Sequence, residues 1–81
     1  MAKVGAVFKI FAEEGRLDAV EEAVKKMNPQ DVRTEDLAFG IKVIKALFVF
    51  EDSESGSSSI EEKLKGIEGV SEVEVEEESL I

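Results

Sequence analysis

The sequence predicts an α+β domain in which two helices cover one face of a four-stranded antiparallel sheet. Two segments carry apolar residues at helical spacing, and four carry them at strand spacing or are apolar on almost every position. These segments follow one another in the order β-α-β-β-α-β, which gives two structurally similar halves. A length of 81 residues is that of one domain, so we expect residues 1–81 to form a single unit.

The first half begins with a strand at residues 3–12, where alternate apolar residues share one face: Val4, Ala6, Phe8 and Ile10. Residues 16–27 predict a helix, because apolar residues recur there at helical spacing: Leu17, Val20, Val24 and Met27. Pro29 should end this helix, since the residue before a proline avoids the helical region. Residues 31–39 are polar and predict a weaker strand at an edge of the sheet.

The second half begins with the strongest predicted strand, at residues 40–52. The serine-rich residues 53–59 predict a flexible loop, which leads into a short helix at 59–69. Residues 70–81 predict a last strand with an acidic, mobile tail. The helices need an apolar core on the sheet, and we expect these residues to be buried in it together: Phe8, Leu17, Val20, Ile44, Phe48 and Leu64.

The strand predicted at 40–52 is apolar on both of its faces. One face belongs to the core and carries Ile44, Ala46, Phe48 and Phe50. The other face, which a two-layer domain leaves uncovered, carries Ile41, Val43, Leu47 and Val49, with Lys45 among them. Two explanations stay open, because an exposed apolar patch usually marks a contact surface, whereas β-branched residues also favour strands without any partner.

Composition excludes several classes of function. The formal net charge is −9, which disfavours direct binding of nucleic acid and suits either solubility or a basic protein partner. The chain has no cysteine and no histidine, so it lacks the usual thiolate and imidazole ligands and the commonest general base. It has neither an apolar run of about 18 residues nor a signal peptide, and we therefore expect a cytoplasmic protein without membrane contact.

No group of residues predicts covalent chemistry. The chain has no glycine-rich phosphate loop, and its serines have no histidine to activate them. The acidic run at 72–78 lacks the spacing of a calcium loop. We therefore predict no catalytic residue, no metal site and no cofactor.

The best candidate for a binding residue is Phe39, which stands next to Gly40 at the corner between two predicted strands. A glycine can turn the chain there, and an aromatic side chain at such a corner can enter a pocket of a partner. The alternative is that Phe39 only covers the edge of the core.

Two stretches resemble motifs of one known family. The stretch "LAFGIK" at 37–42 and the stretch "GIEGVSEVEV" at 66–75 are similar to those of archaeal elongation factor 1-beta, and the similarity includes the opening "KVGAVFKIFAEEG". This resemblance implies a ferredoxin-like fold over essentially the whole chain. It also implies a guanine nucleotide exchange factor of translation, which promotes GDP release and GTP entry on elongation factor 1-alpha without covalent chemistry. GDP, GTP and Mg²⁺ would all be bound by that partner.

The resemblance also implies a partner-binding surface, for which we name Phe39, Gly40, Lys42, Lys45, Leu80 and Ile81. In related eukaryotic exchange domains the motif phenylalanine enters the GTPase, and a lysine near the C-terminus approaches the Mg²⁺ site. Phe39 matches the first of these positions, but Leu80 stands where the lysine would be. We therefore expect Phe39, with carboxylates of the tail, to act in place of that lysine.

A different class of function stays open as an alternative. Regulatory modules of the ACT type share this topology and bind small molecules. They require a dimer and a glycine-rich ligand loop after the first strand, where this sequence has "AEEGR". An RNA-binding domain of the same topology would need exposed aromatic residues on the central strands and a basic surface. This sequence offers aliphatic residues on that face and a net charge of −9, so it does not fit that class.

Overall fold

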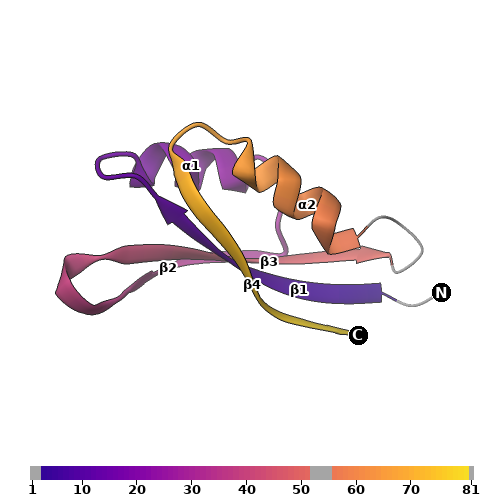
Figure 1. Ribbon diagram of the computed structural model, residues 1–81. Helices are drawn as coiled ribbons and strands as arrows, with labels where there is room; N and C mark the ends of the chain where they lie inside the picture. The colour runs from indigo at the N-terminus through magenta and orange to yellow at the C-terminus, as the bar shows by residue number, and fades with distance from the viewer. Residues whose placement is uncertain (1–2, 52–55, 81) are drawn as a thin grey trace.

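The computed structural model describes residues 3–51 and 56–80, with the side chains of 56–58 left aside. The elements are β1 (Lys3–Ala12), α1 (Leu17–Lys25), β2 (Asp31–Asp36), β3 (Lys42–Glu51), α2 (Gly56–Lys65) and β4 (Val70–Leu80). The strands form one sheet in the order β2-β3-β1-β4, and all neighbouring strands are antiparallel. Both helices lie on the same face of this twisted sheet (Figure 1). The predicted ferredoxin-like β-α-β-β-α-β fold is therefore confirmed.

The core lies between the helices and the two central strands. Register pairs Phe8 of β1 with Ala46 of β3, and Ile10 with Ile44, so the two strands present their apolar residues to the helices together. The buried cluster consists of Ala6, Phe8, Ile10, Val20, Val24, Ile44, Ala46, Phe48, Leu64 and Val73. The predicted core is thus confirmed, except that Leu17 is only partly buried because it begins α1 at the rim of the cluster.

Helix α1 ends before a left-handed residue. Asn28 has a φ of 58°, and it precedes Pro29, so the helical region is closed to it. Asparagine tolerates the left-handed region better than most residues do. The predicted role of Pro29 in ending the helix agrees with this geometry. Among the described residues, neither helix is long and apolar enough to cross a membrane.

Several predicted boundaries in the second half are wrong. Strand β3 begins at Lys42 rather than at residue 40, and α2 ends at Lys65 rather than at residue 69. Helix α2 begins at Gly56, inside the stretch predicted as a loop at 53–59, while residues 52–55 lie outside the described part of the chain. Packing of Ile60 and Leu64 against the core outweighs the weak helix propensity of glycine and serine. Strand β4 continues to Leu80, which pairs with Val4 of β1, so the predicted mobile tail is a paired strand up to that residue.

The open face of β3 is less exposed than the sequence suggests. Val43 is fully buried there, and Leu47 and Val49 are half-buried. In the register Val43 lies between Phe11 of β1 and Glu35 of β2, which flank it on the same face of the sheet. The expected exposed patch on this face is therefore wrong for Val43. Three of the exposed large apolar residues, Leu37, Phe39 and Ile41, lie at the β2–β3 turn, and two more lie on β4.

Candidate functional site

The turn between β2 and β3 places an aromatic residue in a left-handed conformation. The amide of Leu37 donates to the carbonyl of Ile41 at 2.6 Å, and the amide of Ile41 donates to the carbonyl of Ala38 at 3.3 Å. Within this closed turn, Phe39 has φ 63° and ψ 31°, and Gly40 has φ 75°. These angles are those of a type I′ turn, whose two central positions normally carry asparagine, aspartate or glycine.

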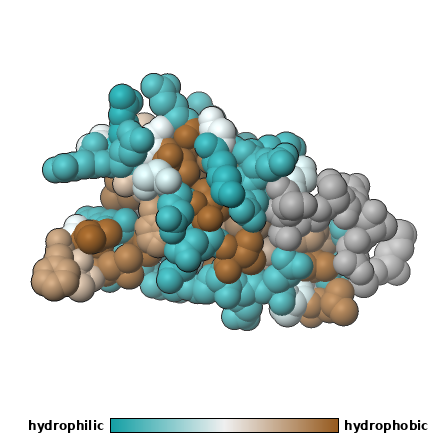
Figure 2. Space-filling view, in the orientation of Figure 1, coloured by the Kyte–Doolittle hydropathy of each residue, from teal (hydrophilic) through white to brown (hydrophobic). Residues whose placement is uncertain are grey.

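Phe39 makes no contribution to the core, because its side chain is 99% exposed. The left-handed conformation costs a non-glycine residue about 1–2 kcal/mol. Leu37 and Ile41, at 39% and 55% exposure, extend the apolar surface around it. Figure 2 shows this apolar surface at the end of the molecule where the β2–β3 hairpin turns. The idea that Phe39 covers the edge of the core is wrong, and strain combined with an exposed apolar group is typical of a binding site.

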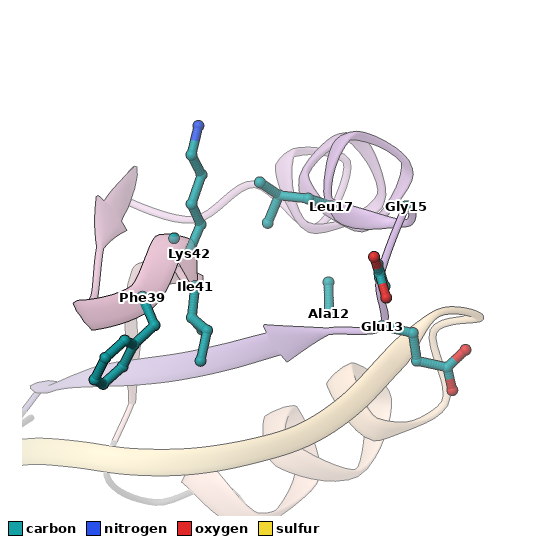
Figure 3. Close-up of a pocket in the computed structure, with 9 residues that line it drawn as sticks. Ala12, Glu13, Gly15, Leu17, Phe39, Ile41 and Lys42 are labelled. Carbon is teal, nitrogen blue, oxygen red and sulfur yellow. The ribbon is translucent and has the colours of Figure 1, made fainter.

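A cleft of 430 Å³ separates this turn from the start of α1. Its lining residues are Ala12, Glu13, Glu14, Gly15, Leu17, Phe39, Gly40, Ile41 and Lys42. Figure 3 shows Leu17 pointing from α1 toward the turn, with Ala12 between the two walls. The ring of Phe39 points away from Leu17, so it does not fill the cleft beside it.

The wall of the cleft formed by residues 13–16 is held by a glycine from the α2–β4 loop. The amide of Glu13 donates to the carbonyl of Gly69 at 2.7 Å, and the amide of Arg16 donates to the carbonyl of Glu13 at 2.9 Å. A Cβ on Gly69 would lie only 2.9 Å from the Cβ of Arg16, and the φ of Gly69 is 96°. Glycine is therefore required at position 69 on both counts.

The two lysines named from the sequence lie in different surroundings. Lys42 lines the cleft, and in Figure 3 its ammonium points outward from the wall opposite Leu17. The ammonium of Lys45 lies on the open face of the sheet, 3.0 Å from Glu35 Oε1 and 3.1 Å from Glu76 Oε1. The hydrogen bonds to Glu35 and then to Glu76 raise the pKa of Lys45 above its ordinary value. Lys45 thus already has two carboxylate partners within the sheet.

The C-terminal candidates lie far from the turn. Leu80 is 69% exposed and pairs with Val4, at the start of β1, whereas the turn lies beyond the other end of β1. The end of β4 and the β2–β3 turn therefore lie toward opposite ends of the molecule, whose longest dimension is 41 Å (Figure 1). Ile81 lies outside the described residues. The structure thus brings Phe39, Gly40 and Lys42 together, and it separates them from Leu80.

Residues 5–81 match the sequence profile of the EF-1 guanine nucleotide exchange domain. The chain belongs to that family. This match covers the turn, both walls of the cleft and all of β4. Within the described residues, no group of three or more carboxylates, histidines or cysteines is arranged to hold a metal ion.

Relatives in the exchange-domain family come from several archaea. The chain is 37% identical to elongation factor 1-beta of Aeropyrum pernix, over 94% of this chain and 93% of the relative. Identity to elongation factor 1-beta of Ignicoccus hospitalis is also 37%, over 94% of this chain and 89% of the relative. For elongation factor 1-beta of Methanospirillum hungatei it is 32%, over the full length of both chains.

Family membership gives the chain the role of a nucleotide exchange factor in translation, and the predicted resemblance is confirmed. It favours this role over an ACT-like regulatory module, which shares the topology alone.

Sequence reasoning found Phe39 through the "LAFGIK" motif, but it missed Leu17 and Glu14 as neighbours of the turn. The signal for Glu14 was the stretch "AEEGR" at residues 12–16, which lies directly before the helix that Leu17 begins.

Proposed function

We propose that this chain promotes GDP release and GTP entry on elongation factor 1-alpha, with Phe39 as the side chain that enters the GTPase. The observation that carries this proposal is the conformation of Phe39, which is strained and 99% exposed at a closed turn. Neither property stabilises the folded chain by itself. Both properties suit an anchor that the fold holds ready for a partner.

The turn favours binding because the anchor is ordered before the partner arrives. The backbone amides of Leu37 and Ile41, on either side of the turn, both donate hydrogen bonds. Docking therefore requires little further ordering of the backbone. Full burial of a phenylalanine side chain contributes roughly 1.5–3 kcal/mol. For exchange, this gain must be larger with the nucleotide-free GTPase than with the GDP-bound form, since equal affinity shifts nothing.

The other named residues have supporting parts in the proposal. Gly40 allows the turn, and Lys42 faces solvent beside the anchor. Leu80 would make a second contact at the opposite end of the sheet, at the position of the family's terminal lysine. Lys45 would have only an indirect part, because its ammonium is already paired with Glu35 and Glu76 on the sheet. No step needs a covalent bond to this chain, because the partner, and not this chain, binds GDP, GTP and Mg²⁺.

The test is the release of a fluorescent GDP analogue from the matching elongation factor 1-alpha. We expect the chain to accelerate this release when it is present below one equivalent, because an exchange factor leaves the GTPase after each exchange. Excess unlabelled GTP must be present to prevent rebinding. No acceleration by a folded sample would overturn the proposed function.

A further inference from the structure

The cleft beside Phe39 is a second feature of this corner of the molecule. It measures 430 Å³ and is open to solvent, and the ring of Phe39 points out of it rather than into it (Figure 3). Small-molecule sites usually enclose most of the surface of their ligand, which an open cleft does not do. A protein partner can close such a cleft with its own surface. The cleft therefore fits a side chain of a docked protein better than a free metabolite.

The lining of the cleft indicates the chemistry of that side chain. Ala12, Leu17 and Ile41 give it an apolar interior. Glu14, which also lines the cleft, adds a carboxylate from the loop before α1. Glu13 carries a second carboxylate on the same loop, although its side chain points away from the turn in Figure 3. With a net charge of −9, the chain attracts basic surfaces over some distance. An apolar group with a cation beside it complements this lining.

We propose that the cleft between residues 12–17 and residues 39–42 receives an apolar side chain of the partner GTPase that has a lysine or arginine next to it. This inference rests on the proposed function. The GTPase would then be held from two sides of one turn, with Phe39 inserted into the partner and a partner residue inserted beside Leu17. Continuity with the anchor identifies the occupant, because Phe39 and Gly40 belong to the lining of the cleft, so a protein that takes up Phe39 lies against this rim.

If the partner contacts both sides of the turn, the loop at 13–16 must keep its position, and its contacts with Gly69 are suited to this. Gly69 accepts the hydrogen bond from Glu13 and leaves no room for a Cβ against Arg16. This packing holds the loop before α1 in place on one side of the cleft, and a wall held in place helps to select the side chain that enters.

The test compares kcat/KM for GDP release among four variants and the wild type. Leu17→Ala widens the apolar wall, and Leu17→Met conserves its volume. Glu14→Lys reverses the charge at the cleft, and Glu22→Lys makes the same charge change at an exposed position of α1 that does not line the cleft. We expect Leu17→Ala and Glu14→Lys each to lower kcat/KM roughly fivefold or more, and their two controls to stay within about twofold of wild type.

If either Leu17→Ala or Glu14→Lys behaves like its control while the wild type is active, the cleft proposal is overturned and the proposed function stands. If the wild type itself does not accelerate GDP release, the proposed function fails and the cleft proposal fails with it. Should Leu17→Ala not fold, Ile41→Ala provides the same test from the opposite wall, at a position that is 55% exposed.

Discussion

The rings of Phe8 and Phe48 meet edge to face at the centre of the core, with their centroids 5.7 Å apart and their planes at 79°. Phe8 is fully buried and Phe48 is 5% exposed. Truncation of a buried phenylalanine removes its contacts and leaves a cavity. We therefore expect Phe48→Ala to lower the free energy of unfolding by roughly 3–5 kcal/mol, measured by chemical denaturation. A loss this large could unfold so small a domain.

Phe39→Ala is the matched control, because it removes the same atoms from a side chain that is 99% exposed. It should change the free energy of unfolding by no more than about 0.5 kcal/mol. A loss below about 1 kcal/mol in Phe48→Ala would contradict the packing described for the core.

Replacing Phe39 by asparagine should make the chain more stable. Asparagine tolerates the left-handed conformation, so the strain at φ 63° would fall. No buried apolar contact is lost, because the ring is exposed. We expect Phe39→Asn to raise the free energy of unfolding by up to about 1 kcal/mol. Destabilisation by more than about 1 kcal/mol would show that the ring supports the fold and is not kept for binding.

The two glycines of the α2–β4 loop should respond differently to alanine. Gly69 has a φ of 96°, and a Cβ there would meet the Cβ of Arg16 at 2.9 Å, so Gly69→Ala should cost about 1–3 kcal/mol of stability. Gly66 has no positive φ, and a Cβ there meets only backbone oxygens at 3.5 Å and 3.6 Å. Gly66→Ala should therefore be neutral, or stabilising by up to about 1 kcal/mol. Equal losses in thermal or chemical denaturation would contradict the close packing of Gly69 on α1.

The ion pairs of Lys45 should be visible in the alkaline pH dependence of stability. Its folded-state pKa lies above the ordinary value of 10.5, because Glu35 and Glu76 accept hydrogen bonds from the ammonium. A raised lysine pKa stabilises the folded state fully below the unfolded pKa, and this contribution is lost as the pH rises through the folded pKa. We expect the wild type to be more stable than Lys45→Met at pH 8. The difference between the two should shrink as the pH rises from the ordinary lysine pKa of 10.5 through the raised pKa of the folded state.

The measurement is chemical denaturation of both proteins at a series of pH values from 8 upward. Because the other lysines are common to both proteins, their titration cancels in the difference. A difference that stays constant over the whole series would mean that these ion pairs do not contribute to stability.

Apolar periodicity predicted the strands, the helices and their order, because each element buries one face in a common core. It misplaced the start of α2, since packing of Ile60 and Leu64 extends the helix into a stretch of weak propensity. It also predicted exposure for Val43, whose shielding depends on neighbours in β1 and β2. Cross-strand shielding cannot be read from one strand.

Phe39 and the cleft also differ in how far the sequence alone predicts them. Phe39 could be identified from the sequence because a single motif carries it. The cleft could not be identified in this way, because Leu17 and Ile41 come to line one cleft only in the folded chain. One wall is also held by Gly69, which is distant in sequence from both walls. Only the tertiary structure brings these three segments together.

The rate of GDP release with wild-type and Phe39→Ala chains tests the central claim most directly. Both proteins are first shown to have the same free energy of unfolding. Loss of an inserted anchor commonly costs about 2 kcal/mol or more of binding, so Phe39→Ala should lower kcat/KM for exchange at least about tenfold. If a folded Phe39→Ala chain accelerates GDP release as well as the wild type does, Phe39 is not the anchor and the account of the strained turn is wrong.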